Sequence, residues 1–269
     1  MLDFAIDIAR RAGALLLEGL NSQRRIELKS AFEVVTDIDR ASEQLIVSAI
    51  RAEFPGHAIL AEESGGTVDN ARPTWLIDPL DGTNNYAHGF PYFAVSLALW
   101  AEQQPLIGVV YDPLRDELFS ASAGRGAHCN NQRLQVSQIA TLGAALVSTG
   151  FPYDYASRTD NNLHEFNHVQ ARCQGVRRSG AAALDLAYVA MGRLDAHWEI
   201  DLKPWDTGAA VLMVREAGGR LSNGRGEPWH PWDDWLIASN GRIHDELIEA
   251  LRIQESEGRS QNEHSAPDS

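Results

Sequence analysis

The sequence predicts an α+β fold, in which strands and helices occupy separate stretches of the chain. Short apolar runs follow one another in the first half, at residues 57–61, 75–77, 93–100 and 106–111. After residue 149 the apolar residues recur mainly at helical spacing. Because strands and helices come in runs and do not alternate strictly, layered α+β packing is expected.

The amino-terminal residues predict a helix. Ala5, Ile8, Ala12 and Leu16 recur every three or four positions, which places them on one helical face. A second helix is expected over residues 39–54, and the Pro-Gly pair that follows ends it. The buried side of this second helix is expected to consist of Ile38, Leu45, Ile46, Ala49 and Ile50.

The middle of the chain predicts a β-meander. Residues 93–100 and 106–111 are separated by a short polar segment that ends in Pro105, which indicates an antiparallel hairpin. Residues 112–116 predict the next turn, and residues 117–121 the returning strand.

The second half predicts three helices and two strands. The helices are expected at residues 181–191, 207–217 and 243–253, and the strands at residues 144–149 and 236–239. We expect a single domain over residues 1–254 with a candidate internal boundary near residue 140. Residues 255–269 are polar or small and predict a disordered tail.

The composition limits the kinds of partner. A formal net charge of −14 argues against nucleic acid or an anionic membrane, because both attract clustered Lys and Arg. An acidic protein that binds a phosphate would need metal ions to offset the repulsion. Cys129 and Cys173 have no pairing pattern, which fits reduced thiols in the cytoplasm. No apolar run approaches membrane-spanning length, and the amino terminus does not read as a signal peptide.

The most informative motif is the Trp-Leu-Ile-Asp-Pro-Leu-Asp-Gly-Thr sequence of residues 75–83. Asp78 and Asp81 supply hard oxygen ligands of the kind that Mg²⁺ prefers. Gly82 and Thr83 follow as a turn that opens into a helix, a place where backbone N–H groups bind anions. An ordinary surface turn would explain an isolated Asp-Pro-Leu-Asp equally well.

Further carboxylates stand where other apolar runs stop. They are Asp37, Asp39, Glu62, Glu63 and Asp206. Each alone has a structural explanation, since Asp39 or Asp206 could cap a helix and the glutamates could be a solvated strand end. Their recurrence at the ends of elements predicts one shared acidic site.

These motifs resemble the inositol monophosphatase family. The matches are Glu-Glu-Ser at residues 62–64, the pattern D-P-x-D-G-T-x-N-[FY] within residues 75–86, and W-D-x-x-A-[GA] from Trp205. Residues 35–39 resemble the upstream acidic element, and the likeness runs from about residue 3 to residue 250, nearest to bacterial members. The resemblance implies an α/β/α/β/α sandwich, a cytoplasmic homodimer, and Mg²⁺-dependent hydrolysis of a phosphate monoester.

The resemblance also implies metal ligands. One metal would bind Glu62, Asp78 and the carbonyl of Leu80, and a second would bind Asp78, Asp81 and Asp206. One ion would activate a water for in-line attack while the other stabilises the leaving oxygen. A third, weaker ion would rest on Glu62, near Lys29. Mn²⁺ would be a substitute, and Li⁺ would inhibit at the second site.

Catalytic and substrate-binding roles follow from the same resemblance. Thr83, polarised by Asp39, would orient the attacking water with Glu62, and Asp39 is favoured over Asp37 for this role. The substrate-binding residues would be Asp81, Gly82, Thr83, Gly180, Ala182, Glu199 and Asp206. Glu199 would accept hydrogen bonds from a polyol hydroxyl, whereas the small residues from Gly180 to Ala182 would leave room for a ring or simply allow close helix packing.

The predicted substrate is myo-inositol monophosphate. Histidinol phosphate, fructose-1,6-bisphosphate and 3′-phosphoadenosine-5′-phosphate remain alternatives, as does a protein-binding role in transcription or ribosome assembly. Two other patterns indicate no separate function. His164-Glu165-Phe166-Asn167-His168 matches a short zinc-protease signature without a third ligand, and Trp229, Trp232 and Trp235 are expected to pack beneath a loop.

Overall fold

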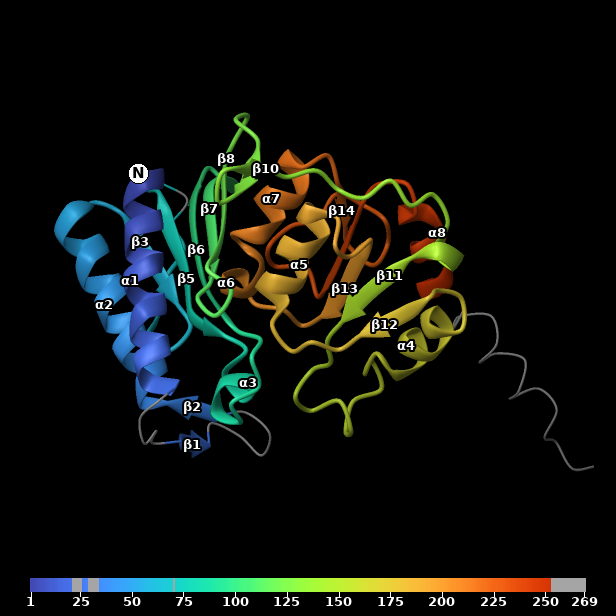
Figure 1. The fold of residues 1–269 in the computed structure, drawn as a ribbon, viewed down its shortest axis with the longest axis horizontal. Helices are drawn as coiled ribbons and strands as arrows, with labels where there is room; N and C mark the ends of the chain where they lie inside the picture. Colours follow the sequence, from blue (N-terminus) through green and yellow to red (C-terminus); the bar gives the residue numbers. More distant parts are fainter. Residues whose placement is uncertain (21–25, 29–33, 70, 253–269) are drawn as a thin grey trace, which may run out of the picture.

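The chain folds into alternating helical and sheet layers. The computed structural model describes residues 1–20, 26–28, 34–69 and 71–252. Helices α1 and α2 form one outer layer, α5 to α7 lie between the two main sheets, and α4 and α8 form the other outer layer (Figure 1). The α+β class and the α/β/α/β/α layering expected from the sequence are confirmed. Lys29 and the predicted tail lie outside the described residues.

The larger sheet has eight strands within the described residues, in the order β10-β9-β8-β7-β6-β5-β3-β4. All neighbours in it are antiparallel except β3 and β5. The strands are β3 (Ala58–Ala61), β4 (Gly65–Gly66), β5 (Thr74–Asp81), β6 (Ala94–Ala101), β7 (Gln104–Asp112), β8 (Glu117–Ser122), β9 (Ala127–Cys129) and β10 (Gln132–Arg133). The predicted hairpin is β6–β7, and the returning strand is β8.

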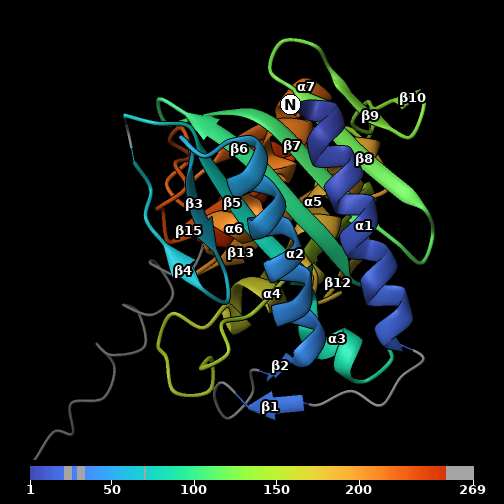
Figure 2. The ribbon, with the colours of Figure 1, turned by 90° about the vertical axis from the view of Figure 1, so that its left-hand side faces the viewer.

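Helices α1 (Leu2–Leu20) and α2 (Asp37–Glu53) cover one face of this sheet (Figure 2). Ile8 and Leu16 of α1 pack against the sheet in a core that includes Trp75 and Leu97. A small hairpin of β1 (Ile26–Leu28) and β2 (Val34–Thr36) precedes α2.

The buried face of α2 differs from the apolar stripe expected from the sequence. Its buried residues are Asp39, Ser42, Glu43, Ile46, Val47 and Ile50. Ile38, Leu45 and Ala49 flank this face and are only partly buried. The difference arises because the first turns of α2 face a polar site and only the later turns face the apolar core.

The middle layer contains α5 (Ala182–Met191), α6 (Pro204–Thr207) and α7 (Ala210–Glu216). The helix predicted over residues 207–217 corresponds to α7, which starts three residues later than expected because a two-residue turn at residues 208–209 separates it from α6. Gly208 lies at this break, and its carbonyl accepts a 3.0 Å hydrogen bond from Trp100 Nε1 of the larger sheet. The contact with the sheet therefore lies where the hydrogen-bonding pattern of the helix is interrupted.

The second sheet has the order β12-β11-β13-β15-β14 within the described residues. Its strands are β11 (Leu146–Thr149), β12 (Gly175–Arg177), β13 (Ala196–Ile200), β14 (Arg220–Ser222) and β15 (Trp235–Ser239). Helices α4 (Leu163–Gln170) and α8 (His244–Arg252) cover its outer face. The central strand β13 was not expected, although the alternation of His197 and Glu199 with Ala196, Trp198 and Ile200 is the pattern of a strand.

The chain passes from the larger sheet to the second sheet between β10 and β11, close to the candidate boundary at residue 140. The domain limits given above stay a prediction. Within the described ranges, no helix combines the length and apolar character needed to cross a bilayer.

We expect Gly108→Ala to destabilise the fold by about 1–3 kcal/mol, because overpacking a close contact forces backbone shifts. A Cβ on Gly108 of β7 would lie 2.3 Å from the carbonyl oxygen of Ala209, the residue before α7 in the middle layer. Urea unfolding measures the change. Gly56→Ala is the matched control, since a Cβ there meets nothing within 4 Å. Equal midpoints for the two variants would contradict this account of the layer contact.

Candidate active site

A cavity of about 710 Å³ brings together the residues that the sequence motifs predicted. It opens between the end of β5, the short helix α3 (Thr83–Ala87), the start of α5, and the loop after β11. The predicted residues that line it are Glu62, Asp78, Leu80, Asp81, Gly82, Thr83, Gly180, Ala182, Glu199 and Asp206. Asp39 does not line the cavity but contacts Thr83 on the side away from the cavity.

The turn after β5 has the geometry of a binding loop. The pairing of β5 with β6 is irregular between Asp78 and Asp81, so the chain departs from the regular ladder there. Leu80 N donates a 3.0 Å hydrogen bond to Asp78 Oδ1. Gly82 has φ 90°, a left-handed conformation that favours glycine, and it directly precedes α3. The sharp turn therefore places Asp78, Asp81 and the first turn of α3 around the same space.

One turn of α2 holds this loop and its neighbour in place. Asp39 accepts a 2.9 Å hydrogen bond from Thr83 Oγ1, and Ser42 Oγ donates a 3.0 Å bond to the carbonyl oxygen of Pro79. Glu43 accepts 2.8 Å bonds from the backbone N–H groups of Glu63 and Ser64. Residues 39, 42 and 43 share a helical face because their spacing is three and four.

The role of Ser42 and Glu43 at the site was not expected from the sequence. The available signal was polar residues at the three- and four-residue spacing of a buried helical face. This pattern indicates that the face meets a polar region and not only a core.

Asp39 both caps a helix and contacts the site. Its Oδ2 accepts a 2.8 Å bond from Thr36 N in a capping box, while Oδ1 faces Thr83. Burial raises the pKa of Asp39, and the bonds from Thr36 and Thr83 oppose that rise. Asp37 is exposed, in agreement with the preference for Asp39.

The Thr83 hydroxyl has two candidate acceptors, Asp39 Oδ1 at 2.9 Å and the Leu80 carbonyl at 3.0 Å. A hydroxyl has a single hydrogen to donate. If the Leu80 carbonyl oxygen binds a cation, the Thr83 hydroxyl donates its hydrogen to Asp39. The lone pairs of the Thr83 oxygen can then accept a hydrogen bond from a water.

Asp81 and Asp206 are fixed by the starts of two helices. Asp81 accepts a 3.1 Å bond from Ala182 N and a 2.9 Å bond from Ala183 N, at the amino-terminal end of α5. Asp206 accepts a 2.7 Å bond from Lys203 N in the capping box of α6. Asp206 therefore does cap a helix, as its alternative explanation stated, and it also lines the cavity. Each carboxylate keeps further lone pairs for a ligand.

The cavity concentrates negative charge. Burial, followed by repulsion from Glu62 and other carboxylates, raises the pKa of Asp78 well above its ordinary value. Burial and the charge of Asp206 do the same for Asp81, and burial raises the pKa of Asp206 to about 8. Buried carboxylates that repel one another are stabilised by a bound cation.

Three basic residues line the cavity, Arg40, Arg178 and Lys203, and two of them are paired with acids. Arg40 and Lys203 line the cavity but form ion pairs of 2.8 and 2.7 Å with Glu27 and Asp201. The donors facing the cavity are hard oxygens, the kind that Mg²⁺ binds. Among the described residues no three His, Cys, Asp or Glu side chains converge as a complete metal cage. The fit to a divalent cation therefore rests on charge and donor chemistry.

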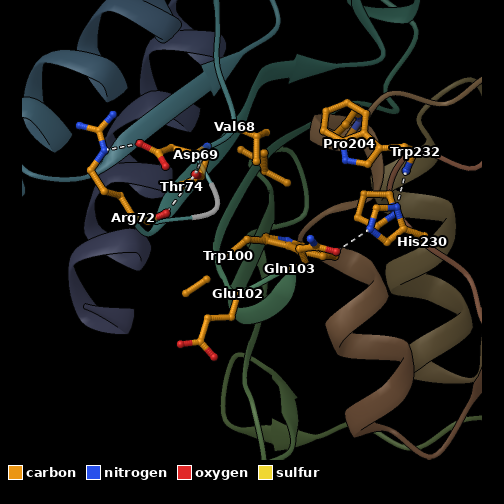
Figure 3. Close-up of a pocket in the computed structure, with 13 residues that line it drawn as sticks. Val68, Asp69, Arg72, Thr74, Trp100, Glu102, Gln103, Pro204, His230 and Trp232 are labelled. Atoms are coloured by element: carbon orange, nitrogen blue, oxygen red, sulfur yellow. Dashed lines mark hydrogen bonds and ion pairs between the residues drawn. The ribbon is translucent and has the colours of Figure 1, made fainter.

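A second, smaller cavity of about 180 Å³ holds none of the predicted site residues. Pro204, His230 and Trp232 lie on one side of it and Asp69 and Arg72 on the other (Figure 3). Arg72 Nε donates a 2.6 Å hydrogen bond to Asp69, so this cavity presents no cluster of uncompensated acids. Its lining mixes apolar, polar and oppositely charged side chains, which distinguishes it from the acidic site.

Two further sequence patterns can be located in the structure. Trp229 is buried, but Trp232 is 58% exposed, so the packing role expected for Trp232 was wrong. In the zinc-like pattern on α4, Glu165 is buried whereas His164 is exposed. The two histidines of that pattern therefore do not face a common interior site.

Comparison with known proteins agrees with the fold and the motifs. The family model described as "Inositol monophosphatase family" matches residues 1–256. The inositol-1-monophosphatase of Synechocystis is 45% identical over 93% of this chain and 88% of its own length. A Pseudomonas aeruginosa protein named Nus factor SuhB is 43% identical over 94% of this chain and 96% of its own length. The structure of inositol monophosphatase from Anabaena matches with a TM-score of 0.85 and 44% identity, over 94% of this chain and 95% of that chain.

These matches place the chain among phosphatases that generally depend on metal ions. The chain belongs to the inositol monophosphatase family. The family resemblance found in the sequence is confirmed, and it covers the whole of the described chain.

We expect Glu43→Gln to cost about 1–3 kcal/mol of stability, because an amide cannot accept from both backbone N–H groups as the carboxylate does. The kcat/KM for a phosphate monoester should fall as well, since the affected turn directly follows Glu62. Urea unfolding and steady-state kinetics measure the two effects. Glu53→Gln, on an exposed position of the same helix, is the control. An unchanged unfolding midpoint in Glu43→Gln would contradict the anchoring role.

We expect the metal-free protein to lose stability as the pH rises from about 4 to about 8. The ordinary pKa of Asp206 is 3.8 and its folded value is about 8, so the folded state binds protons more tightly than the unfolded chain across this range. A divalent cation such as Mg²⁺ held by these carboxylates would take the place of those protons. Its stabilising effect should be larger at pH 8 than at pH 5, by about 5 °C in Tm. Thermal unfolding in EDTA and in excess Mg²⁺ measures this, and a Mg²⁺ effect independent of pH would contradict it.

Proposed function

We propose that this chain hydrolyses a phosphate monoester of a polyol, with myo-inositol monophosphate as the substrate and Mg²⁺ as the cofactor. The observation that carries the proposal is the single cavity in which the acidic motifs, the Gly82-Thr83 turn and Glu199 meet. The 45% identical Synechocystis relative, named an inositol-1-monophosphatase, supports the choice of substrate.

The residues proposed to hold metal are the acidic groups of the cavity and one backbone carbonyl. Glu62, Asp78 and Leu80 O would bind one ion, and Asp78, Asp81 and Asp206 a second, with a third and weaker ion on Glu62. Bound divalent cations supply a lowered pKa for a water and neutralise charge on the phosphate and the leaving oxygen. Mn²⁺ is proposed as a substitute and Li⁺ as an inhibitor.

The side chains near Thr83 position the attacking water. When Thr83 donates its hydrogen to Asp39, its oxygen accepts a hydrogen bond from that water. Glu62 accepts a second bond and draws the proton away as the water attacks in line with the leaving oxygen. Burial of Asp39 keeps bulk water from competing for the Thr83 hydroxyl.

The phosphate and polyol contacts come from different sides of the cavity. The N–H groups of Gly82 and Thr83, where the chain enters α3, would be directed at the phosphate, as expected for a helix start. Glu199 accepts hydrogen bonds from the polyol hydroxyls, while Gly180 and Ala182 leave room for the ring. The acidic motifs contain no Ser, Cys or His nucleophile, so we propose direct attack without a covalent intermediate.

The proposal includes a homodimer in the cytoplasm, with neither nucleic acid nor membrane as a partner. The dimer rests on the family resemblance, and the absence of a polyanionic partner rests on the net charge of −14. Histidinol phosphate, fructose-1,6-bisphosphate and 3′-phosphoadenosine-5′-phosphate are the alternative substrates.

A protein-binding role is the second candidate function. The observation that favours it is the 43% identity with the Pseudomonas protein named Nus factor SuhB. An acidic surface can also dock a basic partner. Binding of a partner that survives the loss of catalysis in Asp81→Asn would establish this role apart from hydrolysis.

The test of the first function is phosphate release from inositol-1-phosphate and the three alternative substrates, with and without Mg²⁺. We expect turnover that requires Mg²⁺, is fastest on inositol-1-phosphate, and falls at least about 100-fold in Asp81→Asn. Excess Li⁺ should inhibit. A preference for another substrate would leave the metal site intact and overturn the role of Glu199. No turnover on any substrate would favour the protein-binding role.

A further inference from the structure

A fully buried imidazole lies between the substrate cavity and the middle layer. His197 is on β13, and its side chain has no exposed surface. Nε2 lies 3.3 Å from Glu199 Oε2 at the cavity. On the other side of the ring, Nδ1 lies 2.9 Å from Ser148 Oγ and 3.8 Å from Asp185 Oδ2.

The Nε2 atom of His197 has no aligned hydrogen bond with any described residue. The Glu199 carboxylate is close enough but lies off the direction that a hydrogen bond requires. A buried donor without a partner is costly, and hydrogen bonds of free active sites often align only when substrate binds. A small rotation of the Glu199 carboxylate would complete this bond.

The carboxylate of Glu199 is confined on its other side by Gly150. A Cβ at Gly150 would lie 1.9 Å from Glu199 Oε1 and 2.1 Å from its carboxyl carbon. The carboxylate therefore fits against bare backbone, and only 15% of the Glu199 side chain is exposed. Gly150 and His197 together limit where this carboxylate can turn.

The far side of His197 is anchored to α5. Asp185 is buried on that helix and accepts a 2.6 Å hydrogen bond from Tyr92 Oη. Ser148 Oγ can donate its hydrogen to Nδ1, whereas Asp185 at 3.8 Å is too far from Nδ1 for a hydrogen bond. A proton on Nε2, which faces Glu199, therefore suits both sides of the ring. The contacts form a connected row, Tyr92–Asp185–His197–Glu199.

We propose that His197 is a positioning residue that donates its Nε2–H to Glu199 and so aims the carboxylate at the hydroxyl groups of a polyol phosphate. One oxygen of Glu199 is held by the imidazole, and the other accepts from the substrate. The pair selects polyol phosphates over monoesters that lack hydroxyls. This role rests on the proposed function only in that Glu199 faces the substrate.

The kinetic test compares inositol-1-phosphate with p-nitrophenyl phosphate, which has no aliphatic hydroxyl, in the Mg²⁺-loaded protein. His197→Phe fills the ring volume without the N–H. We expect KM for inositol-1-phosphate to rise about tenfold relative to KM for p-nitrophenyl phosphate, the effect of losing one charge-assisted hydrogen bond. His197→Gln, which keeps a donor near the Nε2 position, should recover most of the difference. In a His197→Phe, Glu199→Gln double variant the two effects should not add.

A second measurement does not depend on turnover. The imidazole ¹⁵N resonances of His197 should show a proton on Nε2 in the wild type and a shift of that signal in Glu199→Gln. If the wild type fails to hydrolyse inositol-1-phosphate, the proposed function fails while this measurement still tests the His197–Glu199 pair. An Nε2 signal insensitive to Glu199→Gln, or an equal rise in KM for both substrates in folded His197→Phe, would overturn the proposal.

Discussion

Mutual repulsion among buried carboxylates is the constraint on which the rest of this structure depends. Asp78, Asp81 and Asp206 meet in one cavity, where burial and like charge both disfavour ionisation. Backbone N–H groups of Leu80, of the start of α5 and of the start of α6 each stabilise one of them. The layered fold makes this arrangement possible, because β5 of the larger sheet ends beside the first turns of α5 and α6 in the middle layer (Figure 1).

Helix α2 explains how segments distant in the sequence keep one geometry. Only its Arg40 lines the cavity, yet Asp39 and Ser42 bind the turn after β5, and Glu43 binds the separate turn after β3, by hydrogen bonds of 2.8 to 3.0 Å. Buried polar groups that are fully paired specify a unique arrangement, because any other arrangement leaves them unsatisfied. The polar face of α2 is therefore as much a part of the site as the residues that line it.

The sequence alone predicts those parts of the site that lie in continuous motifs. Residues 75–83 and Trp205-Asp206 indicate the acidic cavity, and the β6–β7 hairpin follows from two apolar runs separated by a short polar segment. Two kinds of feature escape such analysis. Strand β13 is only five residues long, so the alternation of His197 and Glu199 with its apolar residues is a short signal that was missed. The break at Gly208 depends on Trp100, more than a hundred residues away, and no local propensity reports such a contact.

The bonds that Glu43 accepts come from the main chain of residues 63 and 64 and not from their side chains. Every amino acid except proline offers the same N–H group. The anchor therefore places almost no demand on which side chains occupy those two positions. Side chains can therefore change at the rim of this cavity, and with them the range of accepted substrates. The backbone geometry that Glu43 anchors stays the same.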